Sequence, residues 1–178
     1  MSRHCVALPG VVALGSNLGD REAILRQAAQ YIDALEGVRV TAASGLVESH
    51  AVKPTGTDEA SPNYLNAVLR IDSALHPEQL LVELNRIEAE LGRVRVERWG
   101  DRTLDLDIIT FAGLRSNTPT LTLPHPLAWQ RPFVIVPWLQ IEADARLDDR
   151  GPIADLDAAH SADVWEFRTG PLFATLDR

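Results

Sequence analysis

Apolar and polar positions alternate along several short stretches of the chain, and this period of two predicts strands. Residues 64–71 show the pattern most clearly, because Leu65, Ala67, Leu69 and Ile71 would share one face and leave the polar positions on the other. Further strands are predicted at residues 11–14, 38–47, 103–111 and 134–141.

Two longer stretches instead place their apolar residues three and four positions apart, as an amphipathic helix does. Asp20 is a suitable N-cap for the first helix, and Gly37 is placed to end it. Pro77 suits the first turn of the second helix, which Gly92 would end. The apolar stripes comprise Ile24, Leu25, Ala28, Ala29, Ile32 and Leu35 in the first helix, and Leu80, Leu81, Leu84, Ile87 and Leu91 in the second.

The elements follow one another as strand, helix, strand, strand, helix, strand. This order predicts an α+β, ferredoxin-like split βαβ (βαββαβ) antiparallel sheet with helices on one face, plus a C-terminal extension. A chain of 178 residues has the usual length of one domain, so residues 1–178 are predicted to form a single domain. Residues 142–178 are polar with scattered Pro and Gly; no structure or chemistry is assigned to them, and Trp165 and Phe167 are their expected anchors.

Composition and charge restrict the possible partners. The chain has 17 Lys and Arg against 25 Asp and Glu, a formal net charge of −8, which disfavours nucleic acid and anionic membranes as general partners. The longest apolar stretch, residues 133–141, falls short of the roughly 20 residues that a membrane-spanning helix needs. Cys5 is the only cysteine, so no internal disulfide is possible and a reducing, cytoplasmic location is expected.

Two carboxylates, Asp105 and Asp107, lie two residues apart in the predicted strand 103–111 and therefore share a face. Like charges at this separation repel unless a cation lies between or above them. Mg²⁺ typically takes one or two carboxylates and completes its shell with water and substrate phosphates. The pair predicts a magnesium site, and the alternative is an edge strand with a solvated acidic face.

Four arginines precede this strand closely. Their guanidinium groups match phosphate oxygens, and beside carboxylates they supply the charges that a metal-bound triphosphate requires. Since 16 of the 17 basic residues are Arg, the clustering partly reflects overall usage, and a network of salt bridges is the alternative. The four residues are Arg93, Arg95, Arg98 and Arg102.

Three further features are compatible with more than one role. His125 lies between Pro124 and Pro126, which restrict its backbone, so it suits either a phosphate contact or a structural position. Trp99 suits loop packing or a cover over bound ligand, and the Gly-Ser-Asn at residues 15–17 suits a plain turn or a close backbone approach to a ligand. The chain has no GxxxxGKS/T loop, no GxGxxG and no Cys/His cluster, which excludes P-loop, Rossmann and zinc chemistry.

The chain resembles the 6-hydroxymethyl-7,8-dihydropterin pyrophosphokinase family in an ordered set of segments: ALGSNLGD at 13–20, YLNAV at 64–68, GRVRVERWGDRTLDLDI at 92–108 and LPHP at 123–126. The resemblance extends to about Trp138 and leaves the tail uncovered. It implies a monomeric ferredoxin-like enzyme of folate synthesis that transfers pyrophosphate from ATP to the pterin hydroxymethyl group and releases AMP. It also implies two Mg²⁺ ions.

Individual roles follow from the same resemblance. Asp105 and Asp107 correspond to the ligands of both magnesium ions. The pterin, 6-hydroxymethyl-7,8-dihydropterin, is expected to bind between the rings of Tyr64 and Phe133, with Asn66 as its polar anchor. The residues implied to surround ATP are Glu88, Arg95, Arg98, Trp99, Arg102, Ile108, Thr122, His125 and Arg131, of which Arg95 and Arg102 are expected to stabilise the transferred group.

Two segments are expected to act as loops over the site. Residues 50–63 are long for a connector, but they lack the tandem prolines of some family members, so no individual pterin contact is assigned there. Residues 93–102 are predicted to be a lid that closes over nucleotide and pterin, because four like charges repel and no apolar stripe anchors them.

Two other functions remain open on the residues alone. One is a non-catalytic ferredoxin-like regulatory module that binds a nucleotide without turnover. The other is a metal-dependent phosphohydrolase, which would release phosphate from ATP without any pterin.

Overall fold

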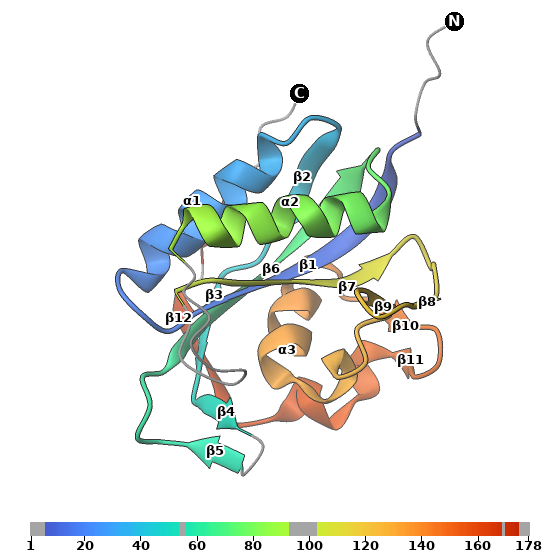
Figure 1. Ribbon diagram of the computed structural model, residues 1–178. Coiled ribbons are helices and arrows are strands. Elements are labelled where there is room, and N and C mark those ends of the chain that lie inside the picture. The colour runs from blue at the N-terminus through green and yellow to red at the C-terminus, as the bar shows by residue number, and fades with distance from the viewer. Residues whose placement is uncertain (1–5, 54–55, 93–102, 169, 175–178) are drawn as a thin grey trace, which may run out of the picture.

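An antiparallel sheet forms the centre of the molecule (Figure 1). The computed structural model describes residues 6–53, 56–92, 103–168 and 170–174. Within them the central sheet has six strands in the order β12-β3-β6-β1-β7, with β2 also paired to β6, and all these pairs are antiparallel. The strands are β1 Leu8–Ser16, β2 Val38–Ala43, β3 Leu46–Ser49, β6 Tyr64–Ser73, β7 Asp105–Phe111 and β12 Val164–Arg168.

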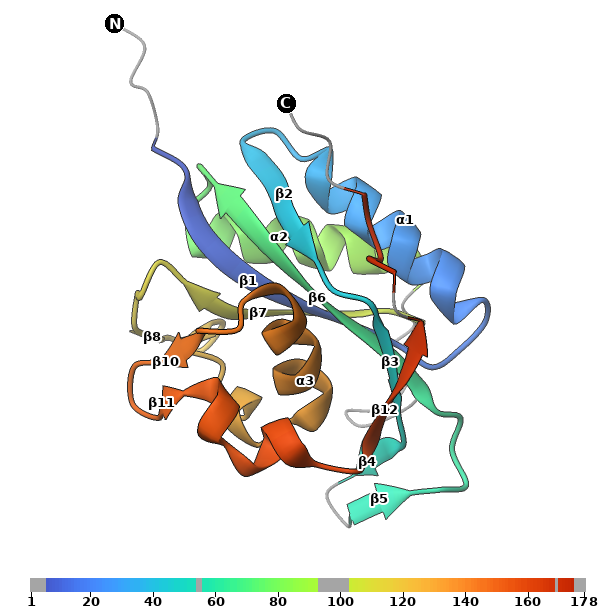
Figure 2. The same ribbon diagram turned by 180° about the vertical axis from the view of Figure 1, so that it is seen from behind.

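Helices α1, Arg21–Asp33, and α2, Pro77–Glu90, cover one face of the sheet (Figures 1 and 2). The Asp20 side chain caps α1 by accepting a hydrogen bond from the Ala23 amide at 3.1 Å. The helix ends at Asp33, earlier than predicted, and Gly37 instead adopts a positive φ of 78° in the turn into β2. The apolar stripes of both helices pack on the alternate residues of β1, β6 and β7 that face them.

This connectivity confirms the predicted α+β fold. Strands β1, β2 with β3, β6 and β7 occupy the four strand positions of the split βαβ order, and the two predicted helices lie on one face. The alternation predicted for β6 is also observed, since Leu65, Ala67, Leu69 and Ile71 all belong to the core beneath α1 and α2.

Residues 134–141 form a helix, so the strand predicted there is wrong. Helix α3, Pro132–Ile141, packs on the opposite face of the sheet (Figures 1 and 2). Its buried residues Val134, Ile135 and Trp138 recur at helical spacing. A continuously apolar run does not distinguish a buried helix from a buried strand, whereas Pro132 in the first turn favours a helix.

The single strand predicted at residues 38–47 is also wrong, because Ser44 divides it into β2 and β3. The amide of Val68 in β6 donates to the Ser44 hydroxyl at 2.9 Å instead of to a backbone carbonyl. The Ser44 carbonyl is then available to Leu172, whose amide donates to it at 2.7 Å. A buried hydroxyl thus replaces one acceptor of the sheet and joins the C-terminal tail to it.

The remaining elements are short. The segment predicted as a loop at 50–63 contains a hairpin, and the tail contributes two 3₁₀ turns besides β12. Two apolar cores result, one between the sheet and α1 with α2, and one between the sheet and α3. These elements are β4 Ala51–Lys53, β5 Gly56–Asp58, β8 Ser116–Asn117, β9 Thr122–Leu123, η1 Ala128–Gln130, β10 Arg146–Leu147, β11 Gly151–Pro152, η2 Ile153–Asp155 and η3 Asp157–His160.

None of the helices formed by the described residues has the length and apolar character needed to cross a membrane.

Candidate active site

Asp105 and Asp107 project from β7 onto the face of the sheet that carries α3. Asp107 pairs with Ala13 of β1, which packs against the α3 core, whereas the intervening Leu106 is buried beneath α1 and α2. Both carboxylates are half-buried. They share a face, as the two-residue period of a strand predicts.

Gly15 of β1 lies between Asp105 and Asn66, and its missing side chain leaves room for the side chains of Asn66 and Tyr64. It pairs with Asp105 of β7 on one side and with Asn66 of β6 on the other. A Cβ atom at Gly15 would lie 3.1 Å from Oδ1 of Asn66 and 3.7 Å from Cδ1 of Tyr64. Because neighbouring strands lie about 4.8 Å apart, Asp105 and Asn66 are separated by about 10 Å across this glycine.

Asn66 is held in one orientation by Ser49. Its Nδ2 donates to the Ser49 hydroxyl at 3.0 Å, and both residues are at least 96% buried, with exposed fractions of 4% and 3%. Ser49 pairs with Tyr64, so it lies on the same face. No motif in the sequence marked Ser49; only the pairing of β3 with β6 brings it to the site.

The backbone at His125 is attached to β7 at an irregularity in the strand. The register with β1 shifts between Val11 and Val12, and the carbonyl of Ile109 accepts the His125 amide at 2.8 Å. The Leu127 amide donates to Nδ1 of the His125 ring at 3.1 Å. Nδ1 is therefore the acceptor, and the ring proton of the neutral imidazole is on Nε2.

The His125 imidazole is neutral at physiological pH. Its pKa is lowered from 6.5 to about 4, mainly by burial and also by the nearby Arg131 guanidinium, while the Asp105 carboxylate opposes both effects. Nε2 lies 3.8 Å from Oδ2 of Asp107. Since the ring carries no charge, this contact is not an ion pair, and Nε2–H is a donor available for an anionic oxygen.

Arg131 connects β7 with the start of α3. It precedes the helix as its N-cap residue, and its Nη1 lies 3.5 Å from both Oδ2 of Asp107 and Nε2 of His125. Its guanidinium carbon also lies 5.7 Å from the centre of the Phe133 ring. Phe133 is one of the two aromatic residues predicted to bind pterin. Through Arg131 it lies next to the cluster that contains Asp107 and His125.

Three other predicted ATP neighbours occupy different positions. The carboxylate of Glu88, 2% exposed, accepts the Leu106 amide at 2.7 Å and so caps a backbone donor of β7. The side chain of Ile108 is buried beneath α1 and α2, so only its backbone is placed to contact a ligand. Thr122 lies on the β8–β9 hairpin, three residues before His125.

The predicted contributions of Arg93, Arg95, Arg98, Trp99 and Arg102 lie outside the described residues. The lid predicted over residues 93–102 stays a prediction for the same reason.

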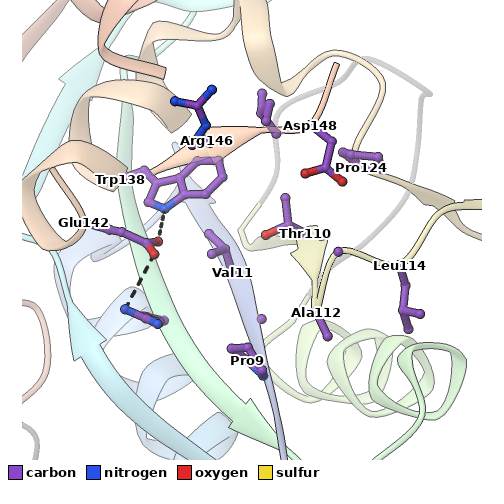
Figure 3. A pocket seen from close by; sticks show the side chains of 14 residues that line it. Pro9, Val11, Thr110, Ala112, Leu114, Pro124, Trp138, Glu142, Arg146 and Asp148 are labelled. Carbon is purple, nitrogen blue, oxygen red and sulfur yellow. Dashed lines mark hydrogen bonds and ion pairs between the residues drawn. The ribbon is translucent and has the colours of Figure 1, made fainter. Parts of the chain in front are cut away.

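A separate cavity of about 240 Å³ lies at the other end of the same face (Figure 3). Val11 and Thr110 form its floor, and the Glu142 carboxylate in its wall accepts Nε1 of Trp138 at 2.8 Å and lies 3.6 Å from Arg70. None of the predicted site residues lines it. It is therefore distinct from the site at Asp105 and Asp107.

The carboxylate pair, with a neutral imidazole and an arginine beside it, suits an enzyme that transfers phosphorus-containing groups, a kinase in the broad sense. The family model for 7,8-dihydro-6-hydroxymethylpterin-pyrophosphokinase (HPPK) matches residues 11–143, and the chain belongs to that family. This confirms the family predicted from the motifs, and with it a transferase of the pyrophosphokinase type in folate biosynthesis.

Curated relatives agree with the family. The chain is 41% identical over 145 residues to 2-amino-4-hydroxy-6-hydroxymethyldihydropteridine pyrophosphokinase of Haemophilus influenzae, which covers 82% of this chain and 88% of the relative. It is 36% identical over 159 residues to the enzyme of that name from Bacillus subtilis, covering 89% and 91%. A third relative of that name, from Pseudomonas putida, is 46% identical over 114 residues, covering 64% and 91%.

Solved structures support the fold. A crystal structure of Plasmodium falciparum HPPK-DHPS with pterin and p-hydrobenzoate superposes with a TM-score of 0.64 at 12% identity. The match covers 89% of this chain and 45% of that one, so the chain spans less than half of the Plasmodium protein.

Proposed function

We propose that this enzyme transfers the pyrophosphoryl group of ATP to the hydroxymethyl group of 6-hydroxymethyl-7,8-dihydropterin and releases AMP. The observation that carries the proposal is the row Asp105, Gly15 and Asn66 across three neighbouring strands. A carboxylate and an amide about 10 Å apart support a phosphate-binding end at Asp105 and a ring-binding end at Asn66. A pterin hydroxymethyl group can reach a bound phosphate across this gap.

The ring-binding end is formed by Tyr64, Asn66 and Phe133. Flat heteroaromatic rings gain from stacking on both faces, and an amide side chain both donates and accepts hydrogen bonds at the ring edge. The bond from Asn66 to Ser49 orients that amide before a ligand arrives. The side-chain oxygen of Asn66 then lies towards Gly15, on the side of the proposed phosphate-binding end.

The donors on β7 fit Mg²⁺. Among the described residues no three His, Cys, Asp or Glu side chains form a metal-binding group, and a pair of carboxylates completed by water and phosphate is the coordination that Mg²⁺ commonly adopts. Asp105 and Asp107 would hold two Mg²⁺ ions, which when bound neutralise charge on the ATP phosphates. His125 donates from Nε2 and Arg131 adds a positive charge at the same place.

The proposed reaction is an in-line displacement at the β-phosphorus. The hydroxymethyl oxygen forms a bond to that phosphorus, the bond to the bridging oxygen of AMP breaks, and the hydroxyl proton passes to solvent or to a carboxylate. Such transfer relies mainly on positioning and on electrostatic stabilisation. Arg95 and Arg102 are proposed to stabilise the transferred group, and the enzyme is proposed to act as a monomer.

A coupled assay for AMP, run with and without the pterin, tests the proposal. AMP formation that requires both ATP and 6-hydroxymethyl-7,8-dihydropterin is the expected result. Phosphate release from ATP without pterin would instead indicate a phosphohydrolase. Nucleotide binding with no product in either condition would indicate a regulatory module.

A further inference from the structure

The segment at residues 50–63 connects two residues that face the site. Ser49 ends β3 and orients Asn66, while Tyr64 begins β6 and is a proposed ring contact. The two residues are paired across the β3–β6 ladder. Any contact that fixes the two ends of the segment therefore also fixes this part of the site.

A closed ring of contacts among five residues joins those two ends to the C-terminal strand β12. Trp165 donates from Nε1 to Oε2 of Glu48 at 3.1 Å, and its ring meets the edge of the His50 ring at 5.0 Å between centres and 62° between planes. Nδ1 of His50 lies 3.1 Å from Oδ1 of Asn63. Arg21 closes the ring, because its Nη1 donates to Oε1 of Glu48 and to the Asn63 carbonyl, both at 2.7 Å.

The ring lies on the face of the sheet opposite to the site. Glu48 pairs with Leu65, which is buried beneath α1 and α2, and Trp165 pairs with Glu48. Side chains alternate along a strand, so the next residue, Ser49, and its partner Tyr64 point to the site face. These five residues therefore hold the strand backbone directly behind the proposed pterin-binding end of the site.

Trp165 is the member of the ring that comes from outside the segment matched by the family model, which ends at residue 143. It reaches the ring because β12 pairs with β3 at the edge of the sheet (Figure 2). Its indole is the link between Glu48 and His50, since the other contacts of Glu48 lead to Arg21. Without the indole, the His50 end loses its packing partner while the Arg21–Glu48 pair remains.

We infer that Trp165 is a positioning residue for the pterin: it holds His50 and Asn63, and through them the strand ends that carry Ser49 and Tyr64. The inference rests on the proposed function. Aromatic pairs and hydrogen bonds to a charged group together support an effect of about tenfold on pterin affinity. ATP binds at the other end of the row, so its affinity should change by less than about twofold.

The test compares Trp165→Ala, Trp165→Phe and Glu166→Ala by steady-state kinetics. Glu166 is the matched control, because it lies on the same strand and its side chain is exposed. Trp165→Ala is expected to raise the KM for pterin about tenfold, with kcat and the KM for ATP within about twofold. Trp165→Phe keeps a ring against His50 and should recover most of the loss, while Glu166→Ala should match the wild type.

An unchanged KM for pterin in Trp165→Ala, or an equal rise for both substrates, would overturn the inference. If Trp165→Ala does not fold, His50→Ala decides by the same criteria, since it removes the adjoining contact of the ring.

Failure of the proposed function would be recognised separately, because the wild type would then make no pterin-dependent AMP. In that case amide hydrogen exchange at residues 59–64 tests whether Trp165 holds this segment in place. Faster exchange in Trp165→Ala than in Glu166→Ala supports the positioning role, and equal exchange refutes it.

Discussion

The two faces of the central sheet are built from alternate residues of the same strands, yet they differ in chemistry. The face beneath α1 and α2 is an apolar core over most of its length, containing for example Leu14, Leu69 and Leu106. The opposite face is apolar only where α3 covers it, around Val68 and Ile109. Where α3 ends, the same strands carry carboxylates, an amide and a glycine instead.

The number of covering helices explains the difference. Two amphipathic helices of 13 and 14 residues exclude water from most of one face, so most strand residues that point there are apolar. Helix α3 has 10 residues and leaves one end of the other face uncovered by a helix. Polar groups at that end can be only partly buried, which gives a ligand both access and a rigid support. The main apolar core and the candidate site thus lie on opposite faces of one sheet.

Removing a carboxylate charge from the face that carries α3 should produce the largest effect. It should lower turnover and leave stability unchanged. We expect Asp105→Asn and Asp107→Asn each to lower turnover at least about a hundredfold, because a bound metal would lose a charged ligand. Steady-state assays at saturating Mg²⁺ measure this, with Asp144→Asn, an exposed carboxylate, as the control. Near-wild-type turnover in both site variants would refute the metal assignment.

A mutation that creates a cavity in the core beneath α1 and α2 should lower stability and leave enzyme activity unchanged. Leu84 of α2 is fully buried, so Leu84→Ala should lower the free energy of unfolding by about 2–5 kcal/mol. Denaturant titration measures the loss, and Val82→Ala, at a position 63% exposed on the same helix, should cost little. Reduced turnover per folded molecule of Leu84→Ala would show that the two faces are coupled.

Removing an aromatic ring from the α3 face should weaken one ligand selectively. Tyr64→Ala and Phe133→Ala are expected to weaken pterin binding by about tenfold each, since stacking is lost, and to leave an ATP analogue largely unaffected. Calorimetric titration with each ligand separately tests this. Tyr64→Phe, which keeps the ring, is the matched control, and equal losses for both ligands would indicate a disordered site instead.

A pH dependence of stability is expected from His125, on the same face. Its pKa is about 4 in the folded protein and 6.5 in the unfolded chain, so between these values the unfolded chain binds more protons. This contribution to stability is therefore complete above pH 6.5 and is lost as the pH falls towards 4. Unfolding of wild type and His125→Gln, measured with a chelator present, should show a steeper acid loss in the wild type. Parallel curves would contradict the buried, neutral imidazole.

Motifs close together in sequence predicted much of the site. Asp105 and Asp107 share a face because strand geometry alone requires it, and YLNAV and LPHP identified the family before any fold was known. Ser49 could not be predicted in this way, because its contact with Asn66 depends on which strands pair and in what register. Glu88 was predicted as an ATP neighbour, and the structure shows that its carboxylate accepts the Leu106 amide.

The sequence by itself determined the apolar face of the sheet and the two helices that cover it, because periodicity is a local property and those elements are amphipathic. It did not determine α3, since a run that is almost continuously apolar has no clear period to read. Nor did it determine the place of the tail, where the Leu172 amide donates to the Ser44 carbonyl and Trp165 reaches Glu48 and His50. Those contacts join residues more than 100 positions apart in the chain. Only tertiary packing decides them, because each side chain finds its partner after the strands have paired.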